Sequence, residues 1–458
     1  MRTLVRGAWL VLPILSACGG GAPESPVPLG PVAWAEVETL FQDKCVRCHT
    51  GTEAATGLRL DDWTALMEGS THGEAVIAGD AERSLLVELA RELDHPGELE
   101  DAEPLTAEEL ATVARWIEGG APSGVGEVPY ADSRDLIYVT NQGSDVISVI
   151  EASAGVVMRT VDLAELGYGP SARPHHVAVE PDGSQWYTTL IGANLVLELN
   201  RLGRVIGSAP FETPGLLAVH PGADRLYVGR SMTAVNAPPR IGVIRPSDMT
   251  IEEVEVFFPR PHATAIAPGG AVFYTGSMSV NQLAAVAEDD RVEVVDVPGP
   301  AYSFMHFDVS PDGQTLVATT HTGELLLFSL ADPMRPELTG SIRLGGMPWT
   351  PAYTPDGRYV FVTNNGNNTV AVVDMETRQV AETIRHPGLA EPYGIALSRD
   401  GRRAFVSGSN TDGSYTPRHA LPGPPPGTVT IIDTQSFEVL RVLEVEQNPT
   451  GVGARRAY

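Results

Sequence analysis

Lysine is almost absent from this chain of 458 residues: Lys44 is the only one, and every other basic residue is an arginine. The 31 basic residues are outnumbered by 58 acidic ones, which gives a formal net charge of −27. Such an acidic chain repels phosphate backbones, and this argues against a nucleic-acid-binding protein. The hydrophobic content of 43% excludes a disordered acidic tail, because that much apolar side chain can fill sizeable cores.

Cysteine and long apolar runs are also scarce. The three cysteines are too few for a disulfide framework. The apolar stretch at residues 8–15 is too short to span a bilayer, and no other stretch is long and apolar enough to do so. Because this stretch follows Arg2 and Arg6, residues 1–17 are predicted to be a signal peptide, and the protein is expected to be exported.

The end of the predicted signal peptide, Leu15-Ser16-Ala17-Cys18-Gly19, resembles the lipobox of bacterial lipoproteins. The resemblance implies that Cys18 carries a lipid. Gly19 stands where inner-membrane lipoproteins have Asp, which implies an outer-membrane protein facing the periplasm or the cell surface. Residues 18–33, rich in Gly and Pro, would then form a flexible tether. The alternative is an ordinary signal peptide followed by a chance cysteine.

The other two cysteines belong to one short motif. Cys45, Cys48 and His49 form C-x-x-C-H, the attachment motif for c-type haem. Two thiols can add to the two vinyl groups of the porphyrin, and the adjacent histidine can bind the iron. A redox-active dithiol is the alternative for C-x-x-C, but no βαβ pattern surrounds it and such a dithiol does not need the histidine. We therefore predict one covalently bound haem c, with His49 as the proximal iron ligand.

Apolar periodicity predicts a helix on each side of this motif. The first precedes Cys45 and contains Trp34, Val37, Leu40 and Phe41. The second spans 107–118, with Thr106 as N-cap, Glu109 completing a capping box and Gly119 after its end.

Two terminal helices that enclose a haem are the cytochrome c arrangement. Residues 36–122 resemble the cytochrome c domain common in planctomycete proteins. The matching segments, in order, are FQDKCVRCHTG, GLRLDDW, GEAVIAGDAERSLL and PLTAEELATVARWIEGGAP.

The second iron ligand departs from this family. Family members usually carry Met-Pro shortly before the last helix, and that methionine binds the iron. Here His95 precedes the proline, and no methionine lies between Met67 and Met158. His95 is therefore the predicted distal ligand, which would lower the reduction potential relative to methionine ligation. Met67, His72 or an open coordination site are the alternatives.

The chain beyond a linker at 121–133 repeats itself about every 45 residues. Each unit combines alternating apolar residues with a PDG-type turn, which predicts four-stranded propeller blades. Six units are complete, whereas the first begins at Asp135 without its inner strand. Because the segment from Asn448 to the end matches an inner strand, we predict seven blades closed by the C-terminus. The segments YVTN at 138–141 and FVTN at 361–364 resemble the YVTN-type propeller repeat, which specifies a fold and no activity.

One position at the start of every inner strand should face the central channel. In chain order it holds His175, Gly215, His262, Met305, Trp349, Tyr393 and Thr450. Three loops on the same face, 231–240, 278–291 and 409–427, are predicted to be long.

This face is a candidate site for a small substrate, a second metal ion or a second haem. Its candidate residues are His175, His262, Met305, Trp349 and Tyr393. The alternative is that these side chains only fill the channel. Some periplasmic dihaem nitrite reductases pair a cytochrome c domain with a haem-binding propeller, but that propeller has eight blades, and the analogy is architectural only.

The negative charge is concentrated near the motif. Residues 18–125 contain 6 basic and 21 acidic residues, a net of −15, against −14 for residues 126–458. The charge could attract a basic redox partner, or it could simply keep the surface solvated.

These patterns predict an all-α cytochrome c domain over residues 34–120, followed by an all-β seven-bladed propeller over 134–458. The predicted function is a lipid-anchored c-type cytochrome that transfers electrons at the cell envelope through one haem. Its partners would be a redox protein and the membrane, with the propeller as a platform for a partner or ligand. The alternative is an oxidoreductase whose propeller binds the substrate or a second redox centre and whose haem accepts the electrons. No catalytic residue is predicted.

Overall fold

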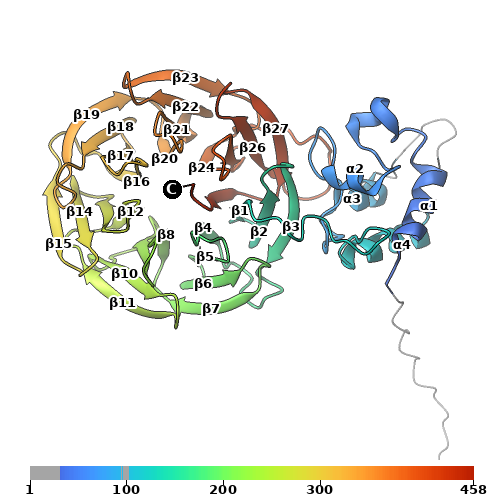
Figure 1. Ribbon diagram of the computed structural model, residues 1–458, viewed down its shortest axis with the longest axis horizontal. Helices are drawn as coiled ribbons and strands as arrows, with labels where there is room; N and C mark the ends of the chain where they lie inside the picture. The colour runs from blue at the N-terminus through green and yellow to red at the C-terminus, as the bar shows by residue number, and fades with distance from the viewer. Residues whose placement is uncertain (1–30, 94, 96–102, 458) are drawn as a thin grey trace, which may run out of the picture. The chain divides into compact units, whose positions relative to one another are not determined.

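The computed structural model describes residues 31–93, 95 and 103–457. The predicted signal peptide, Cys18 and most of the predicted tether lie outside this part of the chain. Four helices come first and are followed by 28 strands (Figure 1). Among the described residues, no helix is both long and apolar enough to span a membrane.

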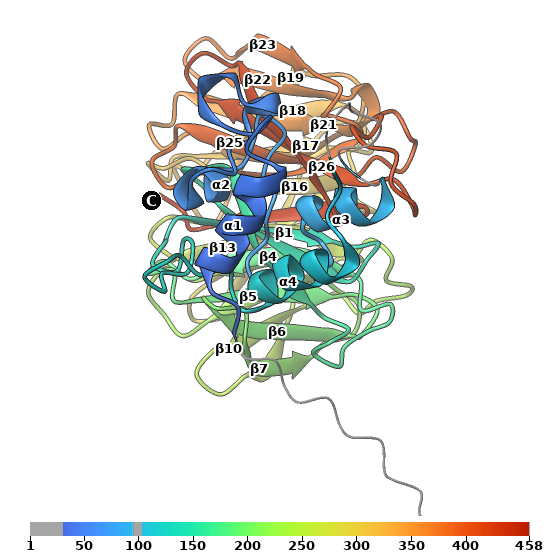
Figure 2. The same cartoon turned by 90° about the vertical axis from the view of Figure 1, so that its right-hand side faces the viewer.

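The four helices form the N-terminal region (Figure 2). They are α1 (Trp34–Lys44), α2 (Trp63–Glu68), α3 (Leu85–Glu92) and α4 (Ala107–Glu118), with short 3-10 turns at Gly51–Glu53 and Ala55–Gly57. The predicted capping box of α4 is confirmed, because the Thr106 hydroxyl accepts from the Glu109 amide and the Glu109 carboxylate accepts from the Thr106 amide.

One apolar core joins α1 to α4. The rings of Trp34 and Trp116 lie 5.3 Å apart, and Phe41 and Ile117 are fully buried beside them. Burying a side chain such as Phe41 contributes about 1.5–3 kcal/mol. The Lys44 ammonium also donates to the Glu109 carboxylate at 2.7 Å, which fastens the end of α1 to the start of α4.

Seven four-stranded sheets form the rest of the described chain, as predicted. We number these blades in chain order and give their strands from the centre outward. Blade 1 contains β28 (Pro449–Ala454), β1 (Leu136–Asn141), β2 (Val146–Glu151) and β3 (Val156–Asp162). Blade 2 contains β4 (Pro174–Val179), β5 (Gln185–Leu190), β6 (Leu195–Asn200) and β7 (Val205–Pro210). Blade 3 contains β8 (Pro214–Val219), β9 (Leu226–Arg230), β10 (Arg240–Arg245) and β11 (Thr250–Glu255).

The other four blades have the same order of strands. Blade 4 contains β12 (Pro261–Ile266), β13 (Val272–Ser277), β14 (Gln282–Ala287) and β15 (Val292–Asp296). Blade 5 contains β16 (Phe304–Val309), β17 (Thr315–Thr320), β18 (Glu324–Ser329) and β19 (Glu337–Arg343). Blade 6 contains β20 (Pro348–Tyr353), β21 (Tyr359–Asn364), β22 (Thr369–Asp374) and β23 (Gln379–Arg385). Blade 7 contains β24 (Pro392–Leu397), β25 (Arg403–Gly408), β26 (Gly427–Asp433) and β27 (Val439–Val445).

The predicted circular closure is confirmed. The last strand, β28, pairs antiparallel with β1, the first strand of the propeller, so blade 1 is built from both ends of this part of the chain (Figure 1). The buried hydroxyls of Thr140 and Thr450 lie 3.1 Å apart and link the two strands. Without this pairing, β1 would be left as an unpaired edge at the centre of the ring.

Two of the three predicted long loops are present, at residues 231–239 and 409–426. The predicted loop at 278–291 is wrong, because β14 occupies Gln282–Ala287 and pairs with both of its neighbours. Its small residues, among them Ala284 and Ala285, are buried between the neighbouring strands β13 and β15, so it lacks the strong apolar alternation of a strand with one exposed face.

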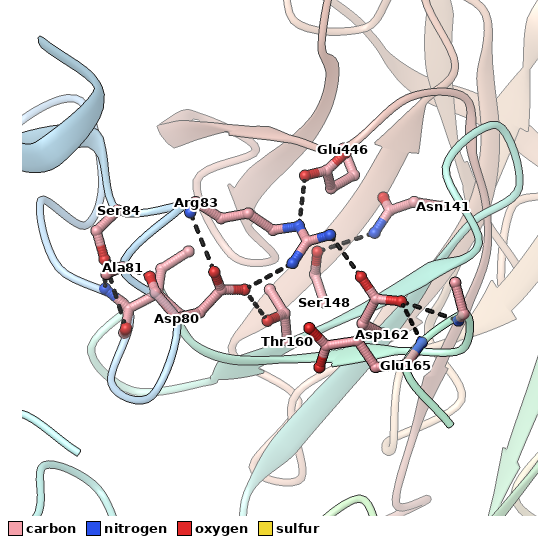
Figure 3. Close-up of polar contacts among 12 residues, drawn as sticks. Asp80, Ala81, Arg83, Ser84, Asn141, Ser148, Thr160, Asp162, Glu165 and Glu446 are labelled. Atoms are coloured by element: carbon pink, nitrogen blue, oxygen red, sulfur yellow. Dashed lines mark hydrogen bonds and ion pairs between the residues drawn. The ribbon is translucent and has the colours of Figure 1, made fainter. Parts of the chain in front are cut away.

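The helical region contacts the propeller at the seam between blades 1 and 7. Arg83 lies at the centre of this interface (Figure 3). Its guanidinium pairs with Asp80 at 3.0 Å, with Asp162 at the end of β3 at 2.7 Å and with Glu446 just after β27 at 2.9 Å. The Thr160 hydroxyl donates to Asp80 as well. Three carboxylates around one guanidinium satisfy its donors in a fixed geometry.

Glu74 lies in the same interface and accepts a hydrogen bond from the Val157 amide at 2.9 Å. Burial raises the pKa of Glu74 to about 7, and this shift is only partly opposed by its backbone hydrogen bonds and by the charges of Arg441 and Arg418. An unfolded glutamate releases its proton near pH 4.5. Between these two values the folded chain holds more protons than the unfolded chain, so folding becomes less favourable as the pH rises.

We therefore predict that the wild-type chain loses about 1–3 kcal/mol of stability between pH 5 and pH 8 relative to Glu74→Gln. Urea unfolding at a series of pH values measures this difference. Glu68→Gln removes an exposed carboxylate from the same region and should follow the wild type. A Glu74→Gln variant that also follows the wild type would contradict the role given to this carboxyl.

A second prediction follows from the closure of the propeller by β28. Deleting residues 449–458 should lower the melting temperature sharply, because β1 loses its inner partner. If the deleted chain does not fold, Gly451→Ala tests the same strand: a Cβ there would lie 2.4 Å from the His175 carbonyl oxygen of blade 2, which should cost about 1–3 kcal/mol. Gly222→Ala meets nothing within 4 Å and is the matched control. Equal stability of the two alanine variants would contradict tight closure.

Candidate haem site

The C-x-x-C-H motif forms a tight turn at the end of α1. The Cys45 amide donates to the Phe41 carbonyl at 2.8 Å, which continues the helix by one residue. The amides of Cys48 and His49 both donate to the Cys45 carbonyl at 3.1 Å. Two thiols and one imidazole are therefore held within a single turn whose position is set by the core contacts of α1.

The His49 ring has one nitrogen already engaged. Its Nδ1–H donates to the Leu58 carbonyl at 3.2 Å, and the His49 carbonyl accepts from the Leu60 amide at 2.8 Å. A metal-binding histidine typically donates its other ring N–H to such an acceptor, which fixes the tautomer and the ring orientation. The Nε2 atom of His49 therefore carries the lone pair needed to bind iron.

The two cysteines differ from a redox-active pair. Both are free, and burial raises the pKa of Cys45 to about 11, with Lys44 opposing and Glu109 adding to the shift. Reactive dithiols have a cysteine with a lowered pKa. Cys45 is instead a protonated thiol at neutral pH, which fits a residue that becomes a thioether.

His95 faces His49 across the site. It follows α3 and is held there by its amide, which donates to the Leu89 carbonyl at 3.3 Å. The ring centroids of His49 and His95 are 6.1 Å apart. This separation suits two imidazoles on opposite sides of one metal ion, given metal–nitrogen bonds of about 2 Å. Partial desolvation and then the nearby His49 lower the pKa of His95, which favours the neutral, metal-binding ring.

The alternative distal ligands lie elsewhere. Met67 is buried in the helical core, and its carbonyl accepts from the Tyr130 hydroxyl at 2.8 Å. His72 lies against the propeller loop 409–426: its carbonyl accepts from Arg418 at 2.8 Å, and its ring is 6.3 Å from that of His419. The structure thus brings His95, and neither Met67 nor His72, next to His49.

His419 was not predicted as a site residue. Its charge affects the pKa of both His72 and His95, so the propeller loop places a third histidine close to the haem site. The only sequence signal was its position in a long loop, because the contact joins segments more than 300 residues apart.

The seven predicted channel positions are each the second residue of an inner strand. Three of them form a continuous layer: the rings of Trp349 and Tyr393 stack at 4.4 Å, and the Tyr393 ring lies 6.0 Å from His175. Met305 packs against Trp349 in the same cluster. His262 is buried and donates from Nδ1 to the Arg230 carbonyl at 2.8 Å.

Two further histidines line the channel and were not predicted. His176 and His306 lie below the layer, with ring centroids 5.7 Å apart, and burial lowers the pKa of both. The repeat could have indicated them, because each occupies the position after the predicted channel position on its inner strand. In the described part of the chain, no group of three His, Cys, Asp or Glu side chains is placed to hold a metal ion.

Residues 45–98 match the family Planctomycete cytochrome C. This match covers the C-x-x-C-H motif and His95 and supports a haem c at this site. No curated protein matches the chain in sequence.

Several solved structures share the propeller. A functionally unknown protein from Desulfotomaculum acetoxidans DSM 771 superposes with a TM-score of 0.58 at 13% identity, over 71% of this chain and 100% of that one. Hydrazine synthase of Kuenenia stuttgartiensis gives 0.52 at 15% identity, over 67% and 94%. Virginiamycin B lyase from Staphylococcus aureus gives 0.50 at 14% identity, over 62% and 89%. At these identities the likeness shows the fold alone.

The contrast between the two thiols is testable in the haem-free protein. Iodoacetamide at pH 8 should modify the exposed Cys48 at least about tenfold faster than Cys45, because only the thiolate reacts and Cys45 has a pKa of about 11. Mass spectrometry of Cys45→Ser and Cys48→Ser, each with one thiol of the pair left, measures the two rates. Equal rates would contradict the burial of Cys45.

Proposed function

We propose that this protein is a c-type cytochrome that transfers electrons at the cell envelope through a single haem. Cys45 and Cys48 hold the haem covalently, His49 is its proximal ligand and His95 its distal ligand. The observation that carries the proposal is the geometry of His49. Its Nδ1–H is bonded to the Leu58 carbonyl, and Nε2 is left free opposite His95, inside the segment that matches a cytochrome family.

The bound haem would supply an iron that gains and loses one electron. Two hydrogen bonds would keep the histidine ligands of that iron in place. His49 is fixed by its hydrogen bond, and His95 is tied to the end of α3 by its amide. Because two histidines raise the potential less than a methionine would, we expect a comparatively low reduction potential.

The envelope location rests on the N-terminal sequence. Cys18 would carry the lipid anchor, with residues 18–33 as the tether to the outer membrane. The net charge of −15 over residues 18–125 would attract a basic redox partner toward the haem. The YVTN-type propeller would serve as the platform that binds a partner or a ligand.

A second candidate function is an oxidoreductase whose substrate binds on the propeller. The loop 409–426 favours it: Ser409 and Thr411 line the channel mouth, and Arg418 of the same loop donates to the His72 carbonyl of the helical region. One segment thus connects the channel mouth to the cytochrome region.

Metal analysis separates the two functions. An electron carrier should contain one iron per chain and no other metal. A second haem or a copper ion that is lost in His175→Ala or His262→Ala would favour the oxidoreductase with a second redox centre.

The distal ligand has its own spectroscopic test. The oxidised protein should lack the weak far-red band that accompanies methionine ligation, and His95→Met should introduce it. Met67→Leu is the matched control and should leave the spectrum unchanged. A far-red band in the wild type that disappears in Met67→Leu would exclude His95 as the ligand.

A further inference from the structure

The mouth of the propeller channel is a cup closed at its floor. A cavity of about 320 Å³ lies there, and His175, Tyr393 and Trp349 are among the residues that line it. These three rings form the continuous layer described above. Below the layer, the next cavity holds only about 20 Å³. The cup is therefore large enough for a small organic molecule, which would stop at the aromatic floor.

Two polar groups of the floor are buried and have no partner among the described residues. His175 is 4% exposed, and its Nδ1 accepts from the Gln142 side-chain amide at 3.2 Å, which places the ring proton on Nε2. That Nε2–H is buried and has no hydrogen-bond partner, and the same holds for the Nε1–H of Trp349, which is 7% exposed. Atoms this deeply buried are out of reach from the cavity, so the floor meets a ligand through its ring faces.

The rim of the cup supplies one free positive charge. Arg173 lines the cavity, and its guanidinium makes no hydrogen bond or ion pair with any described residue. The equivalent arginine of blade 4, Arg260, differs because it donates to the Met232 carbonyl at 2.8 Å. The carboxylate in the lining, Glu391, already accepts from the amides of Thr411 and Asp412. The cup therefore offers one cation that has no partner among the described residues, above an aromatic floor.

We propose that this cup binds a small carboxylate with a planar apolar body. The carboxylate pairs with Arg173 at the rim, and the planar body rests on the layer formed by Trp349 and Tyr393. Arg173 is suited to this role because a guanidinium recognises a carboxylate in a bidentate geometry. The inference names the ligand class for the second candidate function and is independent of electron transfer by the haem.

Benzoate is a probe that contains both features, and titration calorimetry on the full haem-loaded chain measures its binding. Benzyl alcohol keeps the ring without the charge, and acetate keeps the charge without the ring. We expect both to bind at least about tenfold more weakly than benzoate. Arg173→Gln should weaken benzoate binding at least about tenfold, whereas Arg385→Gln, an exposed arginine on the outer strand β23, should leave it unchanged.

The melting temperatures of both arginine variants should equal that of the wild type, since Arg173 is exposed and unpaired. Absence of benzoate binding, or equal binding by wild type and Arg173→Gln, would overturn the proposal. The haem spectrum of the same samples is recorded in parallel. An intact spectrum without benzoate binding would reject the ligand site and leave the proposed cytochrome function standing.

Discussion

The pairing of β28 with β1 is the constraint on which the rest of the structure depends. It joins strands that are more than 300 residues apart and turns seven separate sheets into a ring without a free inner edge. The helical region contacts the propeller at the same seam, because Arg83 forms ion pairs with Asp162 at the end of β3 and with Glu446 just before β28. The position of the haem site on the propeller is thus tied to the closure of the ring.

The two regions meet through charge as well as apolar contact. Ile77 of the helical region packs with Leu443 and Val157 of the propeller, while Arg83 pairs with three carboxylates in a very acidic chain. A protein with only one lysine must use arginine for such contacts. The planar, multidentate guanidinium suits this, since one side chain can bridge two blades and the helical region at once.

The sequence predicted those features that local patterns determine. The capping box at Thr106 and Glu109 and the turn of Cys45 to His49 each depend on residues close together in the chain. The seven blades and their closure followed from repetition, which reveals long-range pairing without any contact information. The strand β14 was not predicted, because its small buried residues lack the apolar alternation by which a strand is predicted from sequence.

The contacts between regions could not be predicted in this way. Arg83 meets Glu446 across 363 positions, and His72 meets the loop residue Arg418 across 346. In their local sequence, neither Arg83 nor His72 can be told from an ordinary surface residue. The channel layer was predicted as a set of positions, but the stacking of Trp349 on Tyr393 and the free Arg173 depend on how the inner strands of different blades converge at the centre.

The central claim is that one haem, held by Cys45, Cys48 and His49, carries one electron at a time. Spectroelectrochemical titration of the purified, haem-loaded chain tests it most directly. The account predicts one reversible transition of the haem spectrum, with one electron transferred per chain. A chain matured under conditions that attach c-type haem, yet without a covalently bound haem or without a reversible transition, would contradict the account.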